Sequence, residues 1–167
     1  MARVLTLTLN PALDLAIRLP SLVLGAVNRT DATHLEAAGK GVNVARVLAA
    51  LGHEVAVSGF LGADNDGVFG RAFTDWGLED AFLRLPGETR INAKLAEAEG
   101  RVTDINGPGL EVAHDDLTAL YAALEVRVAD AATRPDAVVI AGSLPPGVTP
   151  DDLAALIGWL RGHDVPV

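Results

Sequence analysis

The sequence of 167 residues contains no cysteine, which excludes disulfides, thiolate metal sites and cysteine nucleophiles. No apolar run approaches the roughly 18 residues that a membrane span needs. The segment 1–9 is too short and its polar and apolar residues alternate too regularly for a secretory signal peptide. These absences predict a soluble cytoplasmic protein without a membrane partner.

Positive charge is also scarce, because 13 Lys and Arg residues face 22 Asp and Glu residues, giving a net charge of −9. A nucleic acid partner requires a basic face, so the sequence predicts none. The length fits one domain of ordinary size, with half of its residues hydrophobic. Only Lys40 and Lys94 are lysines, so the positions of these two residues are informative.

Strand and helix patterns alternate along much of the chain. Residues 3–9 alternate as a strand, 54–60 form a second, and the apolar run 136–141 suits a buried parallel strand. Helical patterns cover about 41–51, 66–76, 115–129 and 151–162, the last capped by Thr149 or Asp151. This order predicts an α/β fold in which helices flank a parallel sheet.

Other segments alternate without intervening helices, at 13–19, 32–36, 90–97 and 101–106. Glu99-Gly100 separates the last two and is typical of a hairpin turn. We expect a small antiparallel lid sheet, exposed to water on one face, formed by the segments at about 11–36 and 88–107.

Both lysines lie in segments that suit an anion. Gly39-Lys40-Gly41-Val42-Asn43 opens a helix, where free N–H groups and the helix dipole favour negative charge. In the strand that follows Thr89, the residues Arg90, Asn92 and Lys94 share one polar face, and arginine can hold a phosphate through two parallel hydrogen bonds. The structural alternatives are a tight turn entering a helix and a solvated strand face.

Asp14 and Ser143 each follow a predicted strand, and ligands of open α/β sheets bind beyond the carboxyl ends of strands. A carboxylate there can accept hydrogen bonds from sugar hydroxyls, although Asp14 could instead cap its loop. The four histidines show no metal-ligand spacing, so we predict no metal site in this chain.

Four segments together resemble the ordered signatures of the PfkB (ribokinase-like) sugar kinases over essentially the whole chain: 10–14, 38–46, 89–94 and 142–147. Ala-Ala-Gly-Lys-Gly at 37–41, Thr-Arg-Ile-Asn-Ala-Lys at 89–94 and Val-Thr-Asp-Ile-Asn at 102–106 favour the subgroup that acts on fructose 1-phosphate. The resemblance implies a ribokinase-like fold and transfer of the ATP γ-phosphoryl group, with Mg²⁺, to the 6-hydroxyl of that sugar.

The resemblance also implies nine substrate-binding residues: Asp14, Arg29, Gly39, Lys40, Asn43, Arg90, Asn92, Lys94 and Ser143. Asp14 would hold sugar hydroxyls, and Arg90 would bind the phosphate already on the substrate, with Ser143 beside it. Arg29 would reach the site of a neighbouring subunit, in a homodimer that pairs through the lid sheet.

The family's Gly-Ala-Gly-Asp, Asp-x-Ser-Gly and Ser-x-Gly-x-x-Gly segments are absent from the sequence. The first of these supplies the general base, so we assign no catalytic residue within the chain. We interpret residues 1–167 as the N-terminal part of a longer kinase domain that is inactive when isolated. The alternatives are a tagatose-6-phosphate kinase or 6-phosphofructokinase, and a non-catalytic fragment that binds sugar phosphate or mediates dimerisation.

Overall fold

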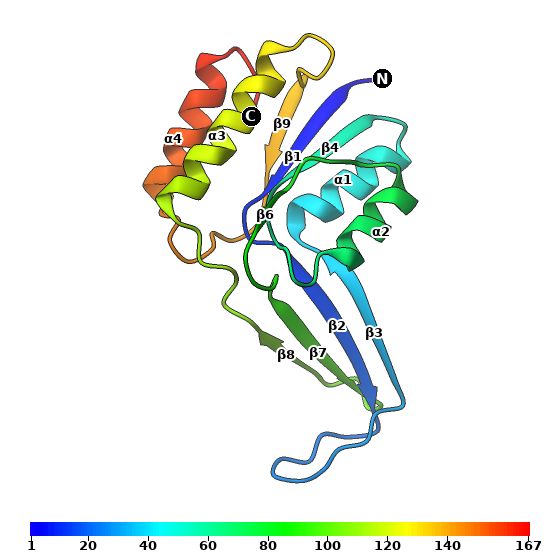
Figure 1. Cartoon of the computed structure of the whole chain (residues 1–167). Coiled ribbons are helices and arrows are strands. Elements are labelled where there is room, and N and C mark those ends of the chain that lie inside the picture. The colour runs from blue at the N-terminus through cyan, green and yellow to red at the C-terminus, as the bar shows by residue number, and fades with distance from the viewer.

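A parallel sheet of five strands forms the main layer of this computed structural model, which describes all 167 residues (Figure 1). The strands are β1 (Arg3–Thr8), β4 (Glu54–Gly62), β5 (Glu79–Asp80), β6 (Leu83–Leu85) and β9 (Ala137–Ile140). β1 lies between β4 and β9, while β5 and β6 both pair with β4. The predicted α/β class with a parallel sheet is confirmed.

Two helices cover each face of this sheet (Figure 1). α1 (Lys40–Ala50) and α2 (Gly67–Trp76) lie on one face, and α3 (His114–Ala129) and α4 (Pro150–Gly162) lie on the other. Alternate residues of β1 therefore enter different cores: its leucines pack with α3 and α4, whereas Thr8 lies against the first turn of α1. Both faces of β1 are buried, so its alternating pattern does not mark a solvent-facing side.

The helix ends follow from local residues. α2 stops at Gly77, whose φ of 66° is left-handed and favours glycine. Thr149 caps α4, because its Oγ1 accepts the Asp152 N–H at 3.2 Å, so Thr149 is the cap of the two predicted. α3 follows Ala113, whose N–H donates to the Asp116 carboxylate at 2.8 Å.

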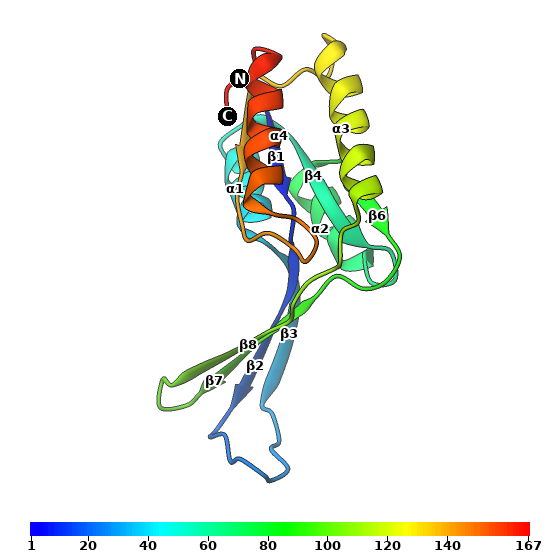
Figure 2. The same ribbon diagram turned by 90° about the vertical axis from the view of Figure 1, so that its left-hand side faces the viewer.

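A second, four-stranded sheet projects from one end of the main layer (Figure 2). Its order is β3-β2-β7-β8, with β2 (Ala12–Leu19), β3 (Ala32–Ala38), β7 (Ile91–Glu97) and β8 (Val102–Asn106). The predicted hairpin is β7–β8. The small sheet is mixed and not wholly antiparallel, because β2 and β7 pair in parallel. β2 follows β1 directly, whereas β7 begins only after the chain has passed through β4, α2 and β6, and both strands leave the main layer at the same end.

The last residues run beside β9, where the Val138 N–H donates to the Pro166 carbonyl at 2.8 Å. This contact agrees with the extended conformation predicted for 165–167. The helices α1 to α4 all fall short of the length and apolar character that crossing a bilayer requires.

Candidate functional site

A cavity of about 220 Å³ lies where the carboxyl ends of β1 and β9 meet the first turn of α1 and the base of the small sheet. Only one of the residues around it is hydrophobic. The lining residues are Asn10, Ala12, Asp14, Gly39, Lys40, Asn43, Arg90, Asn92, Gly142 and Ser143. The structure thus brings together seven of the nine predicted site residues, from segments far apart in the sequence.

The junction between β3 and α1 forms one wall of the cavity. Gly39 has a φ of 132°, and a Cβ there would lie 3.0 Å from Thr8 Cγ2. A Cβ on Gly41 would lie 2.3 Å from Thr8 Oγ1, so only glycine allows α1 to sit this close to β1. No side chain caps this end of α1, which leaves its first-turn N–H groups available to an anion beside Lys40.

Arg90 precedes β7 and is held by backbone carbonyls. Its Nη2 donates to the Asn10 carbonyl at 3.0 Å, its Nε to Pro11 at 3.2 Å and its Nη1 to Gly107 at 3.3 Å. Nη2 also donates to Ser143 Oγ at 3.3 Å. Burial lowers the pKa of the guanidinium and the nearby Asp14 charge opposes that shift, so Arg90 stays a fixed cation at the cavity wall.

Asp14 and Asn92 face each other across the parallel pair β2–β7. Asn92 Nδ2 donates to Asp14 Oδ1 at 3.3 Å, while the buried Oδ1 of Asn92 has no partner. The Asn92 contact holds the Asp14 carboxylate at the cavity, where it can accept hydrogen bonds from ligand hydroxyls.

Two predicted site residues lie outside this cavity. Lys94 is one strand repeat farther along β7 and lines a neighbouring cavity of about 170 Å³ with Asp104 and Asn106, which shares Asp14 and Asn92 with the first. Arg29 belongs to the loop between β2 and β3, at the far end of the small sheet, and lines neither cavity (Figure 1).

Asn10, Asp104 and Asn106 line these cavities but were not identified as site residues from the sequence. The available signal for Asn10 was its position two residues after β1, close to where Ser143 follows β9. Asp104 and Asn106 pair with Lys94 and Asn92 across the β7–β8 hairpin. Their alternation along β8 would have placed them on the same face as Lys94 and Asn92.

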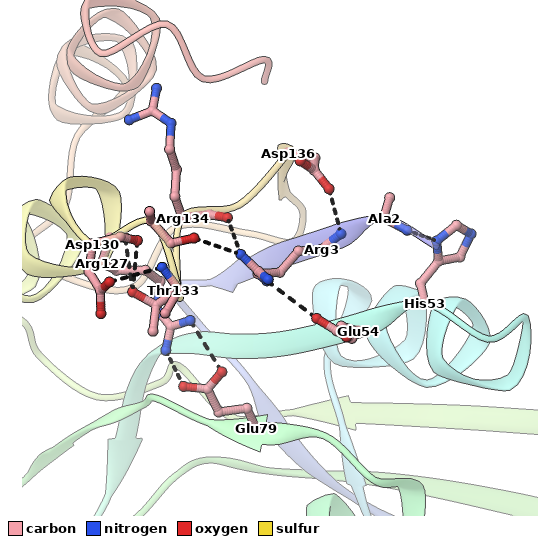
Figure 3. A network of polar contacts seen from close by, with 12 residues as sticks. Ala2, Arg3, His53, Glu54, Glu79, Arg127, Asp130, Thr133, Arg134 and Asp136 are labelled. Carbon is pink, nitrogen blue, oxygen red and sulfur yellow. Dashed lines mark hydrogen bonds and ion pairs between the residues drawn. The ribbon is translucent and has the colours of Figure 1, made fainter.

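A larger cavity of about 270 Å³ lies at the opposite end of the main sheet, beside Arg3, Glu54 and Glu79. Its charged side chains already bind one another (Figure 3). Arg3 Nε pairs with Glu54 at 3.3 Å, and Arg127 pairs with Glu79 through both of its terminal nitrogens. We therefore place the candidate site at the carboxyl end, where Lys40 lines the cavity without an ion pair and the buried Oδ1 of Asn92 has no partner.

No group of three or more histidine, aspartate or glutamate side chains gathers in the structure as a metal site would require.

The sequence pattern of the pfkB family of carbohydrate kinases matches residues 7–167. The chain is 48% identical over 165 residues to a 1-phosphofructokinase of Vibrio cholerae, covering 99% of this chain and 51% of the relative. It is 44% identical over 161 residues to the 1-phosphofructokinase of Escherichia coli, covering 95% and 48%. The chain thus spans about half the length of the curated relatives it matches.

Solved structures show the same relation. A possible 1-phosphofructokinase from Thermotoga maritima superposes with a TM-score of 0.83 and 30% identity, covering 98% of this chain and 52% of that one. Phosphofructokinase-2 of Escherichia coli, solved in complex with fructose 6-phosphate, superposes with a TM-score of 0.84 and 29% identity, covering 99% and 53%. Both similarities run through the main layer and the small sheet, because each covers nearly the whole chain.

Proposed function

Because the chain belongs to the pfkB family of carbohydrate kinases, we propose that the polypeptide carrying it transfers the γ-phosphoryl group of ATP to the 6-hydroxyl of fructose 1-phosphate. The product is fructose 1,6-bisphosphate. The observation that carries this proposal is the single cavity in which Arg90 and Lys40, two cationic groups, face the Asp14 carboxylate. A sugar phosphate presents the matching chemistry, with an anion at one end and hydroxyls at the other.

The residues of the cavity divide the substrate between them. Arg90 and Ser143 bind the phosphate that the sugar already carries, because both are polar donors fixed at one wall. Asp14, held by Asn92, accepts hydrogen bonds from sugar hydroxyls, and Asn43 lines the same space with Gly39 and Lys40. Lys94 extends this binding surface into the adjoining cavity. Together they orient the sugar and limit its motion before phosphoryl transfer.

The chain's own residues bind and orient the acceptor sugar, and none of them is placed as the general base. Phosphoryl transfer relies on positioning and on charge stabilisation of the transferred group, which we assign to polypeptide outside these 167 residues. ATP would be the donor, and a Mg²⁺ ion bound with its phosphates would supply charge neutralisation there. We place this reaction in the cytoplasm, where ATP is available.

We propose that the small sheet acts as a lid and pairs with the same sheet of a second copy. Its polar face, with Asp14 and Asn92, lines the site, and its other face carries a row of apolar residues. Leu35 and Ile105 on that row are 39% and 59% exposed. A second lid sheet would bury this face, and Arg29 of one copy would then reach toward the site of the other.

The second candidate is a 6-phosphofructokinase or tagatose-6-phosphate kinase. The superposition on a phosphofructokinase-2 that binds fructose 6-phosphate supports it. The 48% identity to a 1-phosphofructokinase, against 29% for phosphofructokinase-2, favours fructose 1-phosphate. A binding or dimerisation fragment without catalysis is the third possibility.

A coupled kinase assay on the complete gene product tests this choice with fructose 1-phosphate, fructose 6-phosphate and tagatose 6-phosphate in parallel. We expect the highest kcat/KM with fructose 1-phosphate. Equal or better turnover of another phosphosugar would reverse the order of the candidates, and absence of turnover with all three would favour a non-catalytic role.

The 167 residues alone should transfer no phosphoryl group, because they include no positioned base. The same assay on a chain whose intact mass is 17.3 kDa checks this expectation. Robust turnover by that chain would show that the base lies within it.

A further inference from the structure

Asn10 is a buried polar residue that the proposed binding roles do not use. It is only 5% exposed and lies two residues after the end of β1. Its Nδ2 donates to two groups of the loop that follows β9, Ser143 Oγ at 3.2 Å and the Leu144 carbonyl at 3.2 Å. Asn10 therefore joins the ends of two neighbouring parallel strands at the wall of the cavity.

The orientation of the Asn10 amide is determined by its surroundings. A backbone carbonyl can only accept hydrogen bonds, so the atom facing Leu144 must be the NH₂ group. The amide oxygen points to the loop at Gly109, where a Cβ would come within 2.3 Å of it. Gly109 has a φ of 99° and allows this close approach. The donor of Asn10 is thus directed at Ser143.

Ser143 receives a second donor from Arg90, whose Nη2 donates to the same Oγ at 3.3 Å. A hydroxyl oxygen has two acceptor sites and one proton, and neither the Asn10 amide nitrogen nor a guanidinium can accept that proton. Both acceptor sites of Ser143 are therefore filled by groups that only donate. The Ser143 proton remains as a donor, on an exposed residue that lines the cavity.

Asn10 also supports Arg90 through its backbone, because its carbonyl accepts the Arg90 Nη2 bond at 3.0 Å. One residue thereby orients both of the groups that we assign to the phosphate of the substrate. A hydrogen bond from a hydroxyl to a charged acceptor is stronger than one to a neutral acceptor. A hydroxyl that is already oriented also loses no rotamer freedom when the ligand binds.

From this geometry we infer that Asn10 is a positioning residue that presets the Ser143 hydroxyl as a hydrogen-bond donor to an anionic oxygen of the ligand. The inference rests on the proposed function, in which that oxygen belongs to the phosphate of a sugar phosphate. Ser143 makes the contact, and Asn10 acts through it.

The substitution Asn10→Asp tests the inference because it keeps the size of the side chain and removes the donor. A carboxylate at this position accepts the Ser143 proton and turns it away from the cavity. The substitution also adds a negative charge, so its effect is measured with Ser143 present and with Ser143→Ala. The charge acts in both backgrounds and cancels in the double-mutant cycle.

Binding of fructose 1-phosphate to the complete gene product is measured by calorimetry for the parent, both single variants and the double variant. We expect Ser143→Ala to weaken binding about 10-fold, and Asn10→Asp to weaken it by at least as much. The double variant should bind about as well as Asn10→Asp alone, because the hydroxyl no longer faces the ligand. Fully additive losses would overturn the inference.

Asn65→Asp is the matched control. Asn65 lies outside the cavity and donates through its Nδ2 to the Thr89 carbonyl at 2.9 Å. This variant should lower the unfolding temperature without uncoupling Ser143 from the ligand. If Ser143→Ala no longer weakens binding when it is combined with Asn65→Asp, the role of Asn10 is only structural. Failure of the parent protein to bind any phosphosugar would refute the proposed function, and the inference with it.

Discussion

The two ends of the main parallel sheet are built from similar polar residues but satisfy them differently. At the amino end, Arg3 pairs with Glu54 and Arg127 pairs with Glu79, and the Asp136 carboxylate accepts the Arg3 N–H at 2.7 Å (Figure 3). At the carboxyl end, Lys40 faces the cavity without an ion pair. There the buried Oδ1 of Asn92 has no partner.

This difference separates a structural end from a ligand-binding end of one sheet. A closed network contributes to stability and presents few unsatisfied groups to a ligand. A buried polar group that lacks a protein partner, such as Asn92 Oδ1, lowers stability, and a ligand can supply the missing interaction. Equivalent changes at the two ends, or inside and outside the site, should therefore have different consequences.

The largest expected effect is at Arg90. Arg90→Ala in the complete gene product should lower kcat/KM for fructose 1-phosphate by roughly 10- to 100-fold, because a charge-assisted contact to its phosphate is lost. The KM for ATP should stay nearly unchanged. Arg134→Ala is the matched control, because Arg134 is also held by backbone carbonyls, those of Val128 and His163, at the amino end. It should lower the free energy of unfolding without changing either KM. Steady-state kinetics and urea unfolding distinguish the two variants. If both variants changed the kinetics equally, the carboxyl end of the main sheet would not differ from the amino end in ligand binding.

Gly41→Ala should have the next largest effect. The added Cβ would lie 2.3 Å from Thr8 Oγ1 and 3.1 Å from the Leu7 carbonyl, so α1 must move away from β1. We expect a loss of about 1–3 kcal/mol in the free energy of unfolding, measured in urea, and a higher KM for the sugar phosphate.

Gly70→Ala is the control for this change, because it lies within α2 and its Cβ would meet nothing within 4 Å. It should stabilise the protein by up to about 1 kcal/mol. A similar loss in both variants would show that the fit of α1 against β1 is not the cause.

Glu97, in the small sheet and away from both ends of the main sheet, gives a prediction for how stability depends on pH. Its ion pair with Arg101 and its hydrogen bond from the Leu22 N–H lower the pKa of this carboxyl from 4.5 to about 2. A depressed pKa means that the contribution to stability is complete above pH 4.5 and is lost as the pH falls through about 2. Glu97→Gln should therefore flatten the decline in unfolding temperature between these values.

Glu99→Gln removes the same charge from the neighbouring turn, where no ion pair is lost. This control should keep the acid decline of the parent protein. A decline that persists unchanged in Glu97→Gln would show that the pair with Arg101 does not contribute to it.

The smallest expected effect is a gain. Thr6 is fully buried in β1, and its Oγ1 has no hydrogen-bond partner. Thr6→Val has nearly the same shape and removes the unpaired hydroxyl, so it should stabilise the protein by up to about 1 kcal/mol without affecting kinetics. Calorimetric unfolding measures this change, and a clear loss of stability would mean that the hydroxyl is satisfied in solution.

Local signals in the sequence were sufficient for most elements of the fold. Alternation on both sides of Gly100 predicted the hairpin β7–β8, and the two candidate caps, Thr149 and Asp151, predicted where α4 starts. The parallel pairing of β2 with β7 was not predictable in this way. It depends on where the intervening main layer returns the chain, which no local pattern encodes.

The site shows the same limit. Residues within a known motif, such as Lys40 and Arg90, were identified, and the structure brings them to one cavity. Lys94 lies on the same face of β7 as Asn92 but two residues farther along the strand, and this distance places it in the adjoining cavity. The position of Asn10 between Ser143, Arg90 and the loop at Gly109 depends on three distant segments meeting, so only the structure reveals it.

A crystal structure of the complete gene product with fructose 1-phosphate tests the central claim most directly, namely that the carboxyl end of the sheet is the sugar-phosphate site. We expect the phosphate within hydrogen-bond distance of Arg90 and Ser143, with sugar hydroxyls at Asp14. A sugar phosphate bound at the amino end beside Arg3 and Glu79, or a phosphate turned away from Arg90, would contradict this claim.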